Sequence, residues 1–293
     1  MYPAKFAYVA PKSIDEALTL LEHGNGEAKL MAGGHSLLPL MKLRLAQPAT
    51  LIDIARIPGL GFIEPAADGS AVRIGATVTY RQVQLSDVVK AHLPVVAETM
   101  SLVGDQQVRA RGTLVGGLAH ADPSGDMPAV VLALGATLVA RGLQGSREID
   151  VDEFFVDMLT TSLAENELIT EVRIRKPGPR SGAAYLKFDQ PASHYALTGV
   201  CAVITLSEDG KTISAARLGI TGVGPKAYRP MRVEAALLGV DPTDEKPVEA
   251  ASAGAAEGVD VQGDIHASPP YRAHLARVFT RRAVLEAARR ATA

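Results

Sequence analysis

Two glycine pairs that are far apart in the sequence constrain this chain of 293 residues more than any other feature. The first pair lies within LMAGGHSLLPLMKLRLAQP, Leu30 to Pro48. An apolar run, Leu30 to Ala32, predicts the end of a strand, and the periodic apolar residues after Ser36 predict a helix. Glycines let a ligand approach the backbone, and successive N–H groups form a concave anion site. We therefore expect a strand–loop–helix junction that binds a phosphate, with Ser36 as the helix N-cap.

The second pair lies in GTLVGGLAHADPSGD, Gly112 to Asp126, and repeats this arrangement. Thr113 and the pair Gly116-Gly117 again offer a hydroxyl group and bare backbone to an anion. Two such segments, each followed by apolar residues, suit the two phosphates of a dinucleotide. A nucleoside triphosphate is not indicated, because the pattern G-x-x-x-x-G-K-[ST] does not occur in the sequence.

The polar residues of the second segment allow two weaker interpretations. His120, Asp122 and Asp126 have the side chains of metal ligands, but the proline and glycine between them indicate a turn. Ser124 would be the nucleophile of a hydrolase, but it lacks the G-x-S-x-G context. Anion binding remains the favoured interpretation of this segment.

A third glycine motif, Gly222-x-Gly224-x-x-Ala227, matches a dinucleotide fingerprint in spacing. Pro225 removes an N–H that a phosphate would need, and it would break the helix that should begin there. We interpret this motif as a structural turn.

Composition excludes several classes of function. With 30 basic and 32 acidic residues, the net charge is −2, so a basic face for nucleic acid is not indicated. The single cysteine, Cys201, lies in an apolar run and is expected to be buried; alone it cannot hold an iron–sulfur cluster. The longest apolar stretch, Met127 to Ala140, is too short to span a membrane. No secretion signal is visible, so we expect a cytoplasmic protein without a membrane span.

Strand and helix patterns alternate along the chain and predict an α/β (α+β) fold. The run KPGPRSG, Lys176 to Gly182, combines prolines, glycines and charge and is the best domain boundary. Ser13 is expected to be the N-cap of the helix that follows it. A hairpin turn is expected at Glu208-Asp209-Gly210. The other expected elements are strands over Thr50–Ile54, Ala71–Ala76 and Glu167–Pro177, and helices over Ile14–Glu22, Tyr80–Asp87, Leu93–Leu102 and Tyr271–Arg290.

Taken together, these motifs resemble the flavin-binding medium subunit of molybdenum hydroxylases, the family of the carbon monoxide dehydrogenase medium subunit and of the xanthine dehydrogenase flavin domain. The resemblance covers nearly the whole chain. It rests on A-G-G-H-S at Ala32–Ser36, R-x-R-G-T-x-x-G-G…A-D-P…D-x-P-A at Arg109–Ala129, Tyr185-x-Lys187, and S-P-P-Y-R-A-H-L-A-R-V-F-T-R-R-A at Ser268–Ala283. It implies an FAD-binding domain of two α/β subdomains over residues 1–177, split near 55–60, and a smaller α/β C-terminal domain over 178–293.

The resemblance also implies where FAD binds. The first segment would hold the pyrophosphate and the second its other side, with His120 and Asp126 near the ribityl or flavin end. Leu168 or Ile169 and Lys187 would border the flavin, and Tyr195 would lie close to the isoalloxazine ring. The implied residues are Ala32, Gly33, Gly34, His35, Ser36, Leu37, Thr113, Gly116, Gly117, His120, Asp126, Ile169, Lys187 and Tyr195.

Two positions depart from the family's pattern. Val115 replaces a glycine of the usual T-x-G-G-[SN], unless the glycine pair is displaced by one residue. A β-branched residue cannot adopt a positive φ without strain, so we expect Val115 to restrict the backbone at this position and to narrow the loop. His194 stands where an acidic residue is common; it could change the polarity around the flavin or simply lie on the surface.

The function implied is that of an electron-transfer subunit carrying non-covalent FAD, with no catalytic side chain and no metal of its own. A large partner would carry the molybdenum cofactor and a small partner two iron–sulfur clusters, from which electrons pass through FAD to an external acceptor. The assembly would be a dimer of heterotrimers without nucleic acid. The alternatives are a self-contained flavin-dependent oxidase or dehydrogenase, and a scaffold subunit that has lost FAD.

Overall fold

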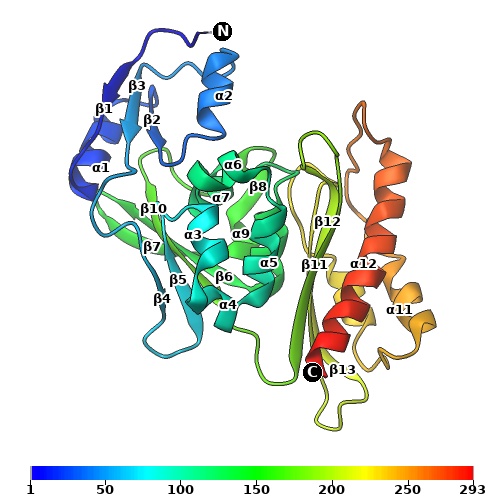
Figure 1. Ribbon diagram of the computed structural model, residues 1–293. Helices are drawn as coiled ribbons and strands as arrows, with labels where there is room; N and C mark the ends of the chain where they lie inside the picture. Colours follow the sequence, from blue (N-terminus) through cyan, green and yellow to red (C-terminus); the bar gives the residue numbers. More distant parts are fainter. Residues whose placement is uncertain (1, 293) are drawn as a thin grey trace.

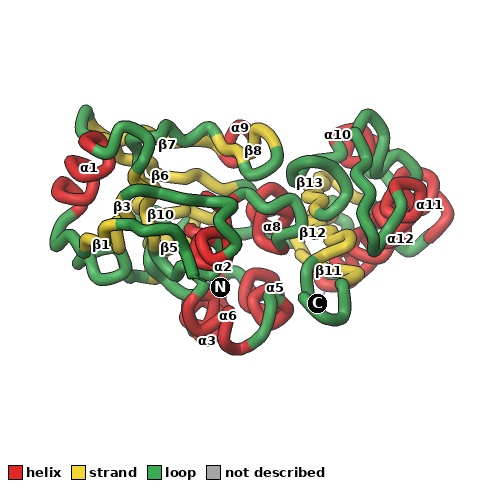
Figure 2. The backbone as a smooth tube through the Cα atoms, turned by 90° about the horizontal axis from the view of Figure 1, so that it is seen from above, coloured by secondary structure: helices red, strands yellow, loops and turns green. Residues whose placement is uncertain are grey.

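The structure is a computed structural model that describes residues 2–292. Three main sheets lie side by side, with helices between and around them (Figure 1). Seen from above, helix α8 (Asp126–Leu134) lies between the central sheet and the C-terminal sheet (Figure 2). Every residue of α8 is buried, so this helix forms the common core of the two halves.

The N-terminal sheet is parallel, with the strand order β1-β3-β2. Parallel neighbours need crossover connections, and helices α1 and α2 belong to them. Ser13 begins α1 as predicted, since its Oγ accepts a hydrogen bond from the Glu16 N–H at 3.1 Å. The elements are β1 (Ala7–Val9), α1 (Ile14–His23), β2 (Ala28–Met31), α2 (Leu37–Lys42) and β3 (Thr50–Asp53).

The central sheet has five antiparallel strands in the order β4-β5-β10-β6-β7. Along β10, Val172 and Ile174 are completely buried, whereas Arg173 between them is partly exposed on the other face. The strands are β4 (Ile63–Pro65), β5 (Ala71–Gly75), β6 (Ala136–Gly142), β7 (Gly145–Asp150) and β10 (Leu168–Arg175).

Helices α3 to α8 lie over one face of this sheet (Figure 1). Besides α8 they are α3 (Tyr80–Leu85), α4 (Asp87–His92), α5 (Pro94–Leu102), α6 (Gln106–Arg111) and α7 (Leu114–His120). A short segment beyond β7 adds α9 (Val151–Phe154) and the hairpin of β8 (Phe155–Asp157) and β9 (Thr160–Thr161).

The C-terminal sheet is antiparallel, in the order β11-β12-β13. Helix α12 packs on one face and α8 on the other. A Cβ built on Gly219 would lie 2.0 Å from the Ala129 carbonyl oxygen, so α8 touches the strand backbone directly. The elements are β11 (Ser181–Asp189), β12 (Ala196–Leu206), β13 (Ile213–Thr221), α10 (Met231–Ala236), α11 (Glu245–Ser252) and α12 (Pro269–Ala291).

The mixed α/β fold class is confirmed, and most expected elements differ from the observed ones only at their ends. Cys201 is buried as predicted. The expected helix Tyr80–Asp87 is instead two helices, because Ser86 is extended and its Oγ accepts from the Val89 N–H to begin α4. The helix after Ser36 ends at Lys42, and Arg44 has a φ of 60°. Within residues 2–292, no helix combines the length and the apolar character needed to cross a bilayer.

Candidate functional site

A cavity of about 770 Å³ lies where the N-terminal sheet, α7 and the hairpin between β11 and β12 meet. Its walls include both glycine segments, which the chain separates by three strands and four helices. The volume is in the range of pockets that hold a large organic ligand. The fold therefore unites the two segments at one site.

Gly33 joins the two glycine segments by direct backbone contact. A Cβ at this position would lie 2.0 Å from the Arg111 carbonyl oxygen and 2.9 Å from the Gly112 Cα, so no other residue fits without displacement. The next residue, Gly34, has a φ of 73°, a conformation that side chains disfavour. Glycine is therefore favoured at position 33 by the close backbone contact and at position 34 by the positive φ.

The predicted side-chain cap at Ser36 is wrong. Ser36 is helical, with φ −102° and ψ −49°, and its hydroxyl group makes no capping hydrogen bond. The first turn begins earlier, where the Leu38 N–H donates to the Gly34 carbonyl at 2.9 Å. The Ser36 side chain therefore remains available at the cavity wall.

The second glycine segment is the first turn of α7 rather than a loop. Thr113 is its N-cap, and its Oγ1 accepts a hydrogen bond from the Gly116 N–H at 3.2 Å. Val115 is helical and only 3% exposed, and it is not among the residues with positive φ. The expectation that Val115 strains and narrows a loop is therefore wrong. The positive end of the α7 dipole lies at the cavity wall.

Replacing Thr113 with alanine is expected to lower the free energy of unfolding by about 1 kcal/mol, because Gly116 loses its N-cap acceptor. Thr113→Ser should keep most of this stability, since it retains the hydroxyl group. Urea unfolding of both variants measures the difference. Equal stability of Thr113→Ala and the wild type would show that the cap contributes nothing.

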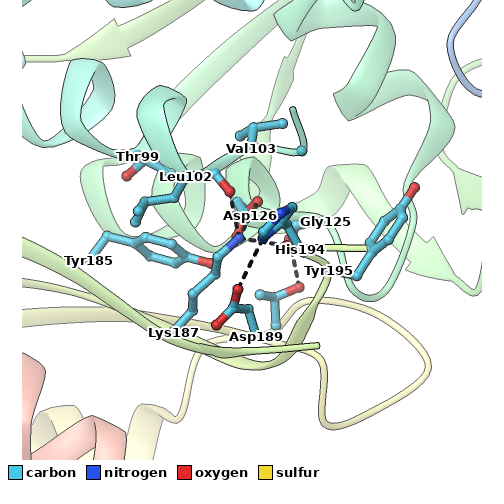
Figure 3. Close-up of polar contacts among 12 residues, drawn as sticks. Thr99, Leu102, Val103, Gly125, Asp126, Tyr185, Lys187, Asp189, His194 and Tyr195 are labelled. Atoms are coloured by element: carbon cyan, nitrogen blue, oxygen red, sulfur yellow. Dashed lines mark hydrogen bonds and ion pairs between the residues drawn. The ribbon is translucent and has the colours of Figure 1, made fainter. Parts of the chain in front are cut away.

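A buried polar cluster lies beside the cavity at the amino end of α8 (Figure 3). Asp126 pairs with the Lys187 ammonium group at 3.1 Å and accepts from the Tyr185 hydroxyl group at 2.6 Å. The Lys187 Nζ also donates to the carbonyl oxygens of Leu102 and His194, both at 2.7 Å. Tyr185 and Lys187 point to the same side because alternate residues of a strand share a face. Lys187 thus ties α5, α8 and the hairpin before β12 together.

The cluster shifts the acid–base properties of its members. Burial raises the pKa of the Asp126 carboxyl group, while the charge of Lys187 and the hydrogen bond from Tyr185 oppose this rise. Burial also raises the pKa of Tyr185 well above its ordinary value, together with the nearby charge of Asp126. Tyr185 therefore stays protonated and donates its hydrogen bond at neutral pH.

The hairpin between β11 and β12 brings Tyr195 and His194 to the cavity. Burial raises the pKa of Tyr195 to about 12, helped by the charges of Asp122 and Asp126. His194 has a φ of 58°, and its Nδ1 lies 3.3 Å from the Asp189 carboxylate. His194 therefore belongs to the wall of the cavity as well as to the protein surface.

All the residues implied by the family resemblance line this cavity except Lys187. Lys187 borders a second, smaller cavity, and its ion pair with Asp126 joins it to the lining of the main cavity. Sequence reasoning missed Tyr80, Leu159 and Leu163, which also line the main cavity. None of the three lies in a glycine motif, so no local pattern singled them out.

The polar turn after α7 has a structural explanation. The Asp122 carboxylate accepts from the Ser124 N–H at 2.8 Å, and the Thr221 hydroxyl group donates to the carbonyls of Pro123 and Gly125. Gly222 has a φ of 80° and its N–H donates to Pro123, as expected of a structural turn. Within residues 2–292, no group of three or more His, Cys, Asp or Glu side chains could hold a metal ion.

The chain matches two family models that together span almost its whole length. Residues 4–177 match the FAD binding domain in molybdopterin dehydrogenase, and residues 183–287 match the CO dehydrogenase flavoprotein C-terminal domain.

Individual relatives match over the full chain. The carbon monoxide dehydrogenase medium chain of Hydrogenophaga pseudoflava is 40% identical, with 97% of each chain covered. The alpha subunit of the 6-hydroxypseudooxynicotine dehydrogenase complex of Paenarthrobacter nicotinovorans is 37% identical, covering 99% of this chain and 97% of the relative. A solved structure of the Hydrogenophaga pseudoflava carbon monoxide dehydrogenase, which lacks the Mo-pyranopterin moiety of its molybdenum cofactor, superposes with a TM-score of 0.95 at 41% identity, covering 99% of both chains.

Proposed function

Because this chain belongs to the family of FAD-binding medium subunits of molybdopterin dehydrogenases, which includes the carbon monoxide dehydrogenase medium chains, we propose that it is the electron-transfer flavoprotein subunit of a molybdenum hydroxylase complex. When bound, FAD would supply the redox chemistry, taking electrons from iron–sulfur clusters of a partner and passing them to an external acceptor. The observation that carries the proposal is the cavity in which the two glycine segments meet.

The lining of this cavity fits an extended dinucleotide. Where the two glycine segments meet, Gly33 and Gly34 remove side chains from the backbone, and the amino end of α7 offers a positive dipole. This part of the cavity suits the pyrophosphate, with Ala32, His35, Ser36 and Leu37 around it. Apolar Ile169 and aromatic Tyr195, which also line the cavity, suit a flat ring.

The chain's own residues would bind and orient the cofactor rather than react. Asp126 is held in place by Lys187 and Tyr185, and its Oδ1 already accepts a hydrogen bond from the Tyr185 hydroxyl group. His120, Gly116 and Gly117 of α7 and its N-cap residue Thr113 also line the cavity.

The visible spectrum of the purified chain, alone and with the subunits that co-purify with it, tests this function. We expect a yellow protein, and acid precipitation should release the colour into the supernatant because no covalent link is proposed. A folded protein that stays colourless after FAD is added would contradict the proposal and favour a scaffold subunit. A yellow chain that oxidises a substrate unaided would favour a self-contained flavin enzyme.

The partners follow from the same proposal. The single buried cysteine of this chain cannot ligate a cluster, so iron–sulfur clusters and the molybdenum cofactor would lie on a small and a large partner subunit. Native mass spectrometry of the co-purified complex should then give two copies of each of three chains.

A further inference from the structure

Tyr80 is a cavity residue that neither the glycine motifs nor the family resemblance indicates. It lies at the start of α3 and lines the main cavity. Within residues 2–292, the Tyr80 hydroxyl oxygen is not one of the fully buried polar atoms that lack a hydrogen-bond partner, so it is open to the cavity. Asp122, Asp126 and Tyr195 lie near enough to affect its pKa. Burial, with these three groups, raises the pKa of Tyr80 above its ordinary value, so the hydroxyl group remains a donor at neutral pH.

Two glycines of the second segment make room for this side chain. A Cβ on Gly112 would lie 2.9 Å from Cε2 of the Tyr80 ring, and a Cβ on Gly117 would lie 2.0 Å from the Tyr80 hydroxyl oxygen. Gly117 is helical with an ordinary φ, so its backbone does not require glycine. A side chain at position 117 would therefore require the Tyr80 hydroxyl group to move from its present place.

The backbone around Tyr80 is fixed to the same segment. The Tyr80 N–H donates to the Gly112 carbonyl at 2.8 Å, and the Leu114 N–H donates to the Val78 carbonyl at 3.1 Å. Thr79 and Gln82 form a capping box that begins α3 at Tyr80. The position of the phenol ring is thus set from both sides.

We propose that Tyr80 is a cofactor-binding residue whose hydroxyl group, admitted beside α7 by Gly117, donates a hydrogen bond to FAD in the cavity. This inference rests on the proposed function, because it assigns a further contact in the same site. A polar group that lacks a protein partner at a cavity wall is satisfied when a ligand supplies the acceptor. The Tyr80 side chain thereby extends from α3 and places its hydroxyl group beside Gly117 of α7, which has no side chain of its own.

The test removes the hydroxyl group from position 80 and introduces one at position 117. In the full-length chain, freed of flavin and titrated with FAD, Tyr80→Phe should raise the dissociation constant about three- to tenfold, the value of one hydrogen bond. The double variant Tyr80→Phe/Gly117→Ser returns a hydroxyl group to nearly the same place, because phenylalanine removes the oxygen that lies 2.0 Å from the new Cβ and leaves the ring carbon Cζ at 3.2 Å. It should bind FAD more tightly than Tyr80→Phe alone.

The matched control is Tyr80→Phe/Gly117→Ala, which fills the same space without a hydroxyl group and should stay at the level of Tyr80→Phe. Gly117→Ser alone should weaken binding, because its Cβ overlaps the Tyr80 hydroxyl group. Unchanged affinity in Tyr80→Phe, or equal affinities of the serine and alanine double variants, would overturn the inference. Failure of the wild-type chain to bind FAD, alone or in its complex, would instead overturn the proposed function.

Discussion

Replacing Lys187 with methionine is expected to lower the free energy of unfolding by about 3 to 5 kcal/mol. The side chains of Lys187 and Asp126 are each only 6% exposed, so the substitution leaves a buried carboxylate without its counter-ion. It also leaves the carbonyls of Leu102 and His194 without a donor. Urea unfolding followed by circular dichroism measures the loss.

Lys211→Met is the matched control, because Lys211 is exposed in the turn between β12 and β13 and forms no ion pair with any of residues 2–292. A change below about 0.5 kcal/mol is expected. Adding Asp126→Asn to Lys187→Met should recover part of the loss, because it removes the unpaired charge. If Lys187→Met proves no less stable than Lys211→Met, the ion pair does not hold these elements together.

The same variant has a definite pH dependence. Lys187 lowers the pKa of Asp126 against the effect of burial, so its removal raises that pKa further above the unfolded value. A carboxyl group with a raised pKa in the folded state favours folding below the unfolded pKa, and this contribution is lost as pH rises through the folded pKa. The stability deficit of Lys187→Met should therefore shrink as the pH falls from neutral through the raised folded-state pKa of Asp126. A deficit independent of pH would show that Asp126 is not the source of the cost.

Replacing Gly33 with alanine is expected to raise the FAD dissociation constant roughly 30- to 100-fold, equivalent to about 2–3 kcal/mol of overpacking. A single methyl group suffices, because it would lie 2.0 Å from the Arg111 carbonyl oxygen and would force the two glycine segments apart. Titration of the flavin-free chain with FAD, monitored by flavin fluorescence, measures the effect.

Gly178→Ala is the control, since a Cβ there meets no atom closer than 4.0 Å, in the loop before β11. It should leave FAD affinity unchanged. Circular dichroism should show that Gly33→Ala keeps its secondary structure, because only the contact of Gly33 with the carboxyl end of α6 is altered. Wild-type affinity in Gly33→Ala would mean that the meeting of these segments does not form the cofactor site.

Local patterns in the sequence predicted the structure correctly wherever the conformation depends only on residues that are neighbours in the chain. Ser13 predicted the start of α1, and the Glu208–Gly210 turn lies between β12 and β13 as expected. Pro225 excluded a helix after Gly222, where the structure has a turn. In each case the residues that set the conformation are neighbours in the chain, so side-chain capping and backbone preferences act without help from distant segments.

The same reasoning failed where the geometry depends on distant residues. Gly116-Gly117 suggested a loop, because glycine pairs favour loops when nothing else acts on them. In the folded chain Thr113 caps a helix there, and the space beside Gly117 is occupied by the Tyr80 hydroxyl group. No local pattern could reveal this, since Tyr80 belongs to another helix.

The sequence by itself determined the fold class, the two glycine segments and the family, because these depend on short-range patterns and on their order along the chain. Only the tertiary structure decided how the segments meet. The contact of Gly33 with Arg111, the support of Asp126 by Lys187 and the place of Tyr80 beside Gly117 each join residues from separate elements. Such contacts are fixed by the packing of whole sheets and helices, which no single stretch of sequence contains.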